Sequence, residues 1–288
     1  MTAATRYGAV AMADGATLVP RLSAAGAADR DMPPGVLWTV GDPALARAAC
    51  VAVIGTRSPT TEGLAAARAW AAALARAGRV VASGHAPGID CAAHAAALAA
   101  GGATVVWAPV GLGPAFRFRF MAELAQLART DAAGANALVF EALAGGRLAV
   151  LSPFAPETKV EPWHFLRRNS LVAAACGAAL VAETGVRGGT LDTARKAALL
   201  RRGIAVTALH PGHARHTPHA MLAAGGATML PPEPDPEGVA LAELLALADR
   251  ADRLADETEA EARADSTFRP DRHRPAALDL FTPAPHSA

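Results

Sequence analysis

Three glycine-rich segments carry the residues whose types and spacing suit ligand binding. They are GTRSPTTEG at 55–63, SGHAPGID at 83–90 and ETGVRGGT at 183–190, and each lies between an apolar run and a helix-forming stretch. Glycine lets the backbone turn tightly, while hydroxyls, free N–H groups and arginine can hold a phosphate. The three segments therefore indicate a phosphate-bearing ligand. In the first segment, helix capping by Ser58, Thr60 or Thr61 is an equal alternative.

Asp90 and His94 follow the second segment and lie one helical turn apart, so they share a face of the expected helix. This spacing could serve an acid–base pair. The structural alternative, which we favour, is that Asp90 caps the helix and His94 donates a hydrogen bond to a neighbouring loop.

The segment PWHFLRRNS at 162–170 combines two aromatic residues with Arg167, Arg168 and Asn169. Rings that stack bases beside guanidinium groups that hold phosphates are typical of proteins that bind single-stranded nucleic acid. On this pattern alone, the default expectation is that Phe165 is an ordinary buried side chain.

Four histidines recur at every third position: His210, His213, His216 and His219. Imidazoles can bind zinc, and four is a suitable number. However, Pro211, Gly212 and Pro218 argue against a regular helix that would present them on one face. We therefore expect a solvated loop and no metal site, or imidazolium groups that add affinity for phosphate below about pH 6.5.

The elements around these segments alternate between strands and helices. Short apolar runs predict strands at 36–40, 50–54, 79–82, 103–108, 147–151, 178–182, 204–208 and 227–230. Between and after them, helices are predicted at 62–77, 90–100, 121–130, 168–176, 190–201 and about 239–263. This alternation predicts an α/β fold with a doubly wound, mostly parallel sheet. Ligands of such sheets bind beyond the carboxyl ends of the strands, where the glycine-rich segments fall.

Composition divides the chain into an N-terminal extension (1–45, with a loose lead-in to about residue 35), a central domain (46–232) and an acidic helix with a proline-rich tail (233–288). We expect about the last twenty residues to be disordered. Residues 51–230 carry 17 basic against 9 acidic side chains, and residues 231–288 carry 6 against 13, which suggests an anion-binding domain followed by a solvating segment. From charge alone we favour the simpler interpretation, that the acidic tail aids solubility.

The 288 residues are 52% hydrophobic and 18% charged, which excludes wholesale disorder. Cys50, Cys91 and Cys176 are scattered and form no CxxC pair, so reduced, buried thiols in a cytoplasmic protein are expected. We expect neither a membrane span nor a signal peptide.

Several spaced motifs occur in an order that resembles the DprA/Smf family (DNA-processing protein A), whose superfamily also includes the LOG-type proteins. Between Val51 and Leu230 these motifs are GTRSPT (55–60), SGxxxGID (83–90) with His94, GGAT (101–104), LSPF (151–154), HFLRRN (164–169), GGTLDTA (188–194) and HPG (210–212). The resemblance implies an extended Rossmann-like fold.

The resemblance also implies a cytoplasmic homodimer that binds single-stranded DNA and helps load the RecA recombinase in natural transformation, with no cofactor and no turnover. By matching motifs, the DNA- or phosphate-binding residues would be Gly55, Thr56, Arg57, Ser83, Gly84, Gly88, Phe165, Arg167, Arg168, Asn169, Arg187, Gly188, Gly189 and Thr190. Pro87 and Leu166 depart from the family pattern, which has a basic residue and a proline at these positions.

Two other functions use the same loops. One is a LOG-like nucleotide phosphoribohydrolase, and the other is a nucleotide-binding sensor. The hydrolase motif PGGxGTxxE would place a glutamate after the third loop, but Gly188-Gly189-Thr190 is followed by Leu191-Asp192-Thr193. This departure favours binding over hydrolysis.

Overall fold

The computed structural model describes residues 4–5, 7–14, 18 and 35–264. The predicted disorder of the last twenty residues falls outside this range, and so does most of the N-terminal lead-in. None of the helices within the described range has an apolar stretch long enough to cross a membrane.

A nine-stranded sheet runs through the described part of the chain. Its strands, in spatial order, are β11 (Thr228–Leu230), β10 (Gly203–Thr207), β9 (Ala178–Glu183), β5 (Cys50–Gly55), β6 (Val80–Ser83), β7 (Thr104–Trp107), β8 (Leu148–Ser152), β4 (Val36–Gly41) and β3 (Ala11–Asp14). All neighbours from β11 to β8 pair parallel, whereas β4 and β3 add an antiparallel edge. The predicted α/β class with a mostly parallel sheet is confirmed.

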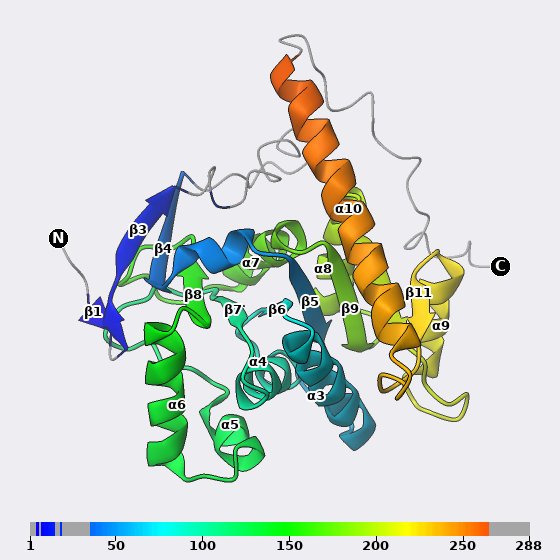
Figure 1. Cartoon of the computed structure of the whole chain (residues 1–288), viewed down its shortest axis with the longest axis horizontal. Coiled ribbons are helices and arrows are strands. Elements are labelled where there is room, and N and C mark those ends of the chain that lie inside the picture. Colours follow the sequence, from blue (N-terminus) through cyan, green and yellow to red (C-terminus); the bar gives the residue numbers. More distant parts are fainter. Residues whose placement is uncertain (1–3, 6, 15–17, 19–34, 265–288) are drawn as a thin grey trace.

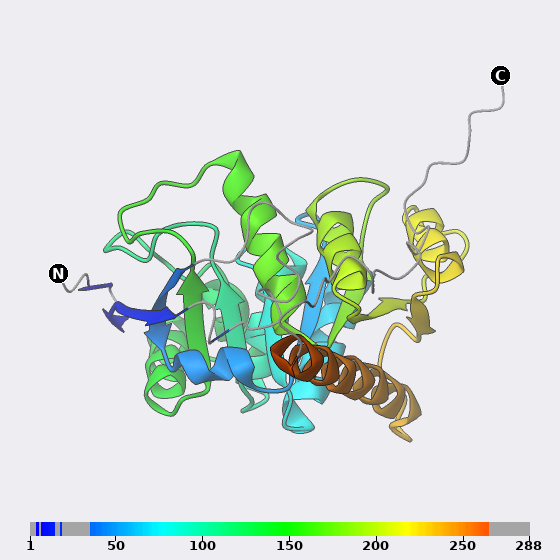
Figure 2. The same ribbon diagram turned by 90° about the horizontal axis from the view of Figure 1, so that it is seen from above.

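Helices cover both faces of this sheet. One face carries α3 (Thr61–Arg76), α4 (Ile89–Ala99), α5 (Met121–Leu127), α6 (Ala132–Ala144) and α10 (Val239–Ala264). The other face carries η1 (Pro43–Arg47), α7 (Pro162–Ala175) and α8 (Gly189–Leu199), while α9 (His216–Ala224) lies beside β10. Figure 2 shows α7 and α8 on one side of the sheet and α10 on the opposite side. Strands buried on both faces explain why the sequence shows continuous apolar runs.

The N-terminal segment is more ordered than its composition predicts. Its residues form a short hairpin of β1 (Ala4–Thr5) and β2 (Gly8–Ala9), and β3 then pairs with β4. Figure 1 shows these strands at the end of the sheet opposite β11 and α9. The expectation of a loose lead-in is therefore wrong for the residues of these strands.

Helices α6 and α7 differ from the sequence prediction, and so does α9, which falls on the segment that was expected to be a loop. Helix α6 was not predicted, and its N-cap is Asp131, whose carboxylate accepts a hydrogen bond of 2.8 Å from Gly134 N. Helix α7 starts six residues earlier than predicted, because Pro162 occupies its first turn and Glu161 and His164 form a reciprocal capping box. The earlier start places the aromatic residues of this segment inside the helix.

The acidic helix α10 begins at the predicted residue and packs on the sheet through its apolar face. Leu244 and Ala248 are buried there. Two ion pairs fix the helix, since Arg79 contacts Asp249 at 2.8 Å and Arg202 contacts Asp252 at 3.6 Å. The acidic residues of this segment thus partly neutralise the basic domain.

The order of the strands reverses between β5 and β9. From β5 the chain proceeds through α3 towards β6, and from β9 it proceeds through α8 towards β10, on the opposite face. The loops that leave these two strands therefore separate and open a crevice at their carboxyl ends.

Candidate functional site

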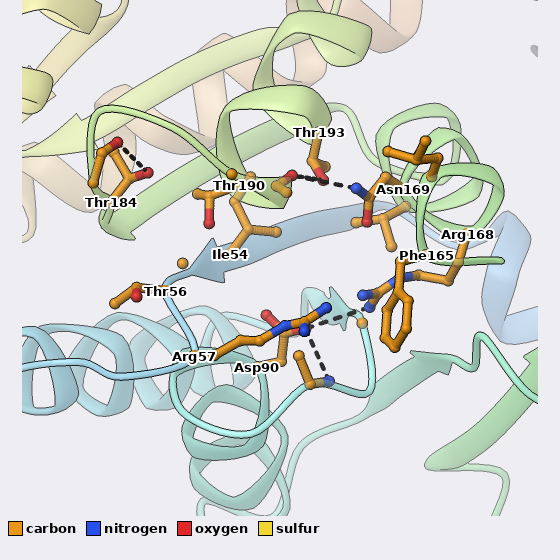
Figure 3. Close-up of a pocket in the computed structure, with 18 of the residues that line it drawn as sticks. Ile54, Thr56, Arg57, Asp90, Phe165, Arg168, Asn169, Thr184, Thr190 and Thr193 are labelled. Atoms are coloured by element: carbon orange, nitrogen blue, oxygen red, sulfur yellow. Dashed lines mark hydrogen bonds and ion pairs between the residues drawn. The ribbon is translucent and has the colours of Figure 1, made fainter. Parts of the chain in front are cut away.

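A cavity of about 750 Å³ opens at this reversal of strand order. The loops after β5, β6 and β9 line it together with the first turns of α7 and α8 (Figure 3). Most of the predicted site residues are brought together here: Gly55, Thr56, Arg57, Gly84, Asp90, Phe165, Arg168, Asn169, Arg187, Gly188, Gly189 and Thr190.

Four predicted residues lie outside the cavity wall. Ser83 is buried and donates a hydrogen bond to Val53 O at 2.7 Å. Gly88 lies behind the wall, where an added Cβ would meet the backbone of Thr56 and Arg57. Arg167 and His94 also lie outside the residues that line the cavity.

Arg57 and Phe165 meet at the cavity, and Figure 3 shows them coming from the loop after β5 and from α7. The guanidinium carbon of Arg57 lies 4.5 Å from the centroid of the Phe165 ring. This is a cation–π contact. Arg57 is exposed and Phe165 is only partly buried, so the expectation of an ordinary core phenylalanine is wrong.

Arg168 forms the floor of the cavity. Its Nη1 donates to Asp90 Oδ2 at 3.3 Å, and the same oxygen accepts a hydrogen bond from Ala86 N. Burial lowers the pKa of Arg168, while the charge of Asp90 opposes this shift. Its Nε has no hydrogen-bond partner among the described residues. Gly84 leaves the space for this guanidinium, because an added Cβ would overlap it.

The N-terminus of α8 opens onto the cavity. Its N-cap is Gly188, with φ of +127° and ψ of −176°, and no side chain from the described residues caps it. The backbone N–H groups of Gly189 and Thr190 are at the positive end of the helix dipole, where anions bind. The amide of Asn169 is already engaged, since its Nδ2 donates to Gly189 O and to Asp192 Oδ2. Asn169 therefore holds α8 in place.

Sequence reasoning missed the buried carboxylate of Glu183 at the end of β9. It accepts hydrogen bonds from both the backbone N and the hydroxyl of Thr60, and it pairs with Arg215 at 2.7 Å. Arg215 also donates to Ser58 O at 2.7 Å. The carboxylate thus ties together the loops after β5, β9 and β10. The sequence feature that could have identified this residue is a single glutamate at the end of an apolar strand.

Thr60 also settles the capping question for the first glycine-rich segment. It is the N-cap of α3, and its hydroxyl accepts a hydrogen bond from Gly63 N at 3.1 Å. Thus the segment both caps a helix and contributes Arg57 to the cavity.

His94 is completely buried, with Nε2 at 2.7 Å from Gly84 O and Nδ1 at 2.7 Å from Thr104 Oγ1. Burial lowers its pKa to about 4. Asp90 lies in the first turn of α4 rather than at its N-cap, which is Gly88. Since their contacts hold the loop and the cavity floor, these two residues fit the structural interpretation.

The histidine-rich segment is not a solvated loop throughout. His216 begins α9, Pro218 fits into its first turn, and His219 is completely buried. His219 Nε2 accepts a hydrogen bond from Thr184 N, and its Nδ1 lies 2.7 Å from Thr207 O. Within the described range, no group of three or more side chains could hold a metal ion.

The sheet and its cavity define a protein of Rossmann-like fold with a cationic crevice where the strand order reverses. A family sequence model, described as DNA recombination-mediator protein A, matches residues 21–235. The chain belongs to this family, as its motifs predicted.

Relatives and solved structures agree with this membership. The chain is 37% identical over 174 residues to a putative DNA processing protein DprA of Mycobacterium tuberculosis (60% of this chain, 40% of the relative). It is 32% identical over 166 residues to DprA of Bacillus subtilis, which corresponds to 57% of this chain and 50% of the relative. The chain therefore spans half or less of the length of these two relatives.

Two solved structures share the fold. The structure of DprA from Streptococcus pneumoniae superposes with a TM-score of 0.59 at 26% identity and covers 75% of this chain and 69% of that one. The structure of DprA from Helicobacter pylori, described for its single-stranded DNA binding mode, superposes with a TM-score of 0.60 at 23% identity. This match covers 80% of this chain and 93% of that one. The predicted Rossmann-like fold is confirmed.

Proposed function

We propose that this chain binds single-stranded DNA in the cavity and acts as a DNA-processing and recombination mediator. The observation that carries the proposal is the Arg57–Phe165 contact beside the open N-terminus of α8. A ring, a guanidinium group and a set of free backbone N–H groups match the base and the phosphates of an unpaired strand. The single-stranded DNA binding mode described for the H. pylori protein supports the same ligand.

The cavity favours an unpaired strand over a duplex for a physical reason. Phe165 can stack only on a base whose face is accessible, whereas the bases of a duplex are stacked on each other. The exposed guanidinium groups of Arg57 and Arg187 supply the sequence-independent attraction to phosphate.

Binding without turnover is part of the proposal. The titratable pair that could serve catalysis is engaged elsewhere, since Asp90 holds Arg168 and His94 is buried against Gly84 and Thr104. Incubation with nucleoside monophosphates should release no free base, as monitored by chromatography. Base release above a buffer control would overturn this part of the proposal.

We also propose that the protein is a cytoplasmic homodimer that acts with the RecA recombinase. Strand β11 is an edge of the sheet, and Met221 and Met229 near it are exposed, which supports self-association. The family description as a recombination mediator supports a recombinase partner. Sedimentation velocity tests the dimer, and a pull-down with purified RecA tests the partner.

The test of DNA binding is a fluorescence-anisotropy titration with oligo-dT and with duplex of equal length, at two salt concentrations. We expect tighter binding to oligo-dT, with affinity falling as salt rises. Arg57→Ala should weaken binding at least about tenfold and reduce the log–log salt slope by about 0.7, because one phosphate would no longer be neutralised.

The matched control is Arg76→Ala, which removes an equal charge from an exposed residue in the last turn of α3. This variant should bind like the wild type. Absence of oligo-dT binding at low salt, or equal losses in the two variants, would overturn the proposal.

A further inference from the structure

Trp163 is an exposed tryptophan held in a fixed orientation. Nearly half of the residue is exposed (49%), and its Nε1 donates to Glu161 Oε2 at 2.6 Å. Its ring stands edge-on to His164, with centroids 4.1 Å apart, and to Phe154 at 5.6 Å. A rigid, half-exposed ring needs little ordering before another ring stacks on it.

The position of Trp163 on α7 separates it from the cavity wall. Phe165 and Leu166 line the cavity, whereas Trp163 does not. Trp163 lies one turn before Arg167, so these two residues share a face of the helix. Leu166, three residues after Trp163, lies between this face and the cavity. The surface around Trp163 is therefore continuous with the rim.

Arg167 supplies a cation on this same face. Its Nε is buried and has no hydrogen-bond partner among the described residues. It was expected in the cavity from its motif, but it does not line the cavity, and its spacing on α7 places it on the same face of the helix as Trp163. A ring and a guanidinium group one turn apart repeat the combination that Phe165 and Arg57 make inside the cavity.

Further cations continue this surface along the carboxyl edge of the sheet. The loops after β7 and β8 lie side by side, since Gly111 N donates to Thr158 O at 3.0 Å. Arg117, Arg119 and Lys159 on these loops are exposed. Arg119 N also donates to His85 Nε2, in the loop after β6 that helps line the cavity. The loops that carry these cations are thus connected to the cavity through the loop after β6.

We propose that Trp163, Arg167, Arg119 and Lys159 form an outer track that binds the continuation of the strand held in the cavity, with one base stacked on Trp163. The inference rests on the proposed function. A cavity of about 750 Å³ cannot enclose a long strand, so the strand must cross the rim. Among the Phe, Tyr and Trp side chains described, the other exposed one is Phe140, which lies on α6 with its ring centroid 5.9 Å from that of Tyr7.

Intrinsic fluorescence gives the first test. Of the four tryptophans, Trp70 and Trp107 are completely buried and Trp38 is partly buried on β4. Saturation with an oligo-dT of about twenty nucleotides should quench the emission through stacking on Trp163. Trp163→Phe should lose most of this quenching while it still binds the oligonucleotide. Binding to the wild type without quenching would overturn the proposal.

The second test compares oligo-dT of about four and about twenty nucleotides by anisotropy. Trp163→Ala should weaken binding of the long strand about five- to 150-fold, the range for loss of one stacked base, and leave the short strand unaffected. Arg167→Ala should also weaken binding of the long strand, but by a smaller factor than Trp163→Ala. Val239→Ala, which truncates an exposed apolar residue at the start of α10, is the control and should change neither.

The outcomes separate the track from the cavity. If the Trp163→Ala variant binds the long strand as tightly as the wild type does, the proposal of an outer track is wrong and the proposed function is unaffected. If this variant loses affinity equally for the short and the long strand, the proposal of an outer track is also wrong, because Trp163 would then affect binding through the conformation of α7. If the wild type binds no oligonucleotide of either length, the proposed function fails and the track fails with it.

Discussion

The loops that open α4 and α8 are both glycine-rich and both follow a buried strand, but the space beside their glycines is used differently. In the first loop, protein atoms fill it. The Arg168 guanidinium lies where a Cβ on Gly84 would be, and the backbone of Thr56 and Arg57 lies against Gly88. In the second loop, nothing lies within 4 Å of a Cβ built on Gly188, and Gly189 meets only Asn169 Nδ2 at 3.5 Å.

This difference shows that a glycine pattern specifies a tight turn and not the identity of what approaches it. The first loop makes room for the protein's own arginine, so it builds the cavity floor. The second loop leaves its N–H groups open, so it can receive an anion. Variants of the two loops should therefore affect different properties, stability for the first and binding for the second.

The largest effect is expected for Gly84→Ala. The new methyl group must displace the Arg168 side chain and break its buried pair with Asp90. Disrupting a buried ion pair costs about 3–5 kcal/mol, so the free energy of unfolding should fall by that amount. Urea denaturation followed by circular dichroism measures it. A loss below about 1 kcal/mol would show that Arg168 relocates freely and that the two loops are alike.

A second expected effect is loss of stability in mild acid, through His85 in the first loop and His94 on the helix that follows it. Burial lowers the pKa of His85 to about 3 and that of His94 to about 4. The unfolded chain binds these protons at about pH 6.5. Stability is therefore complete above pH 6.5 and falls as the pH drops towards 4, by up to about 2 kcal/mol per histidine between pH 6.5 and 5.

His94→Gln should reduce this pH dependence, even if the variant is less stable at neutral pH. The measurement is the urea midpoint at several pH values between 5 and 7.5. An unchanged slope in the variant would mean that His94 is accessible to protons in the folded state.

The smallest effect on stability is expected for Gly189→Ala. Its methyl group would make an ordinary contact with Asn169, and alanine is a good helix former, so the free energy of unfolding should change by less than about 0.5 kcal/mol. The same methyl group obstructs the approach of a phosphate to the N-terminus of α8. We expect affinity for oligo-dT to fall about tenfold, as when one hydrogen bond to a charged group is removed. Unaltered affinity would indicate that α8 does not contact the strand.

The elements of the sheet could be predicted from sequence because buried parallel strands are continuous apolar runs that end at glycine or polar residues. β5 ends at Gly55 and β6 at Ser83, close to where the apolar runs stop. Helix α6 was missed because Gly134 and Asn136 lower its helix propensity. The edge strand β3 was missed because its AMAD sequence has little β-propensity and depends on pairing with β4.

The candidate site was only partly predictable, because side-chain direction depends on tertiary packing. Arg167 and Arg168 are adjacent in the sequence, but only Arg168 lines the cavity, where it is buried against Asp90. The contact between Thr60 and Glu183 joins residues 123 positions apart. Nothing local in either segment specifies this contact.

The buried carboxylate of Glu183 has a consequence for recognition. It joins the loops after β5, β9 and β10, and the next residue, Thr184, is held by His219 from α9. The walls of the cavity are therefore fixed when the chain folds. An incoming strand would lose its own conformational freedom on docking but would not have to order its receptor, so the conformational entropy lost on association would come mainly from the DNA.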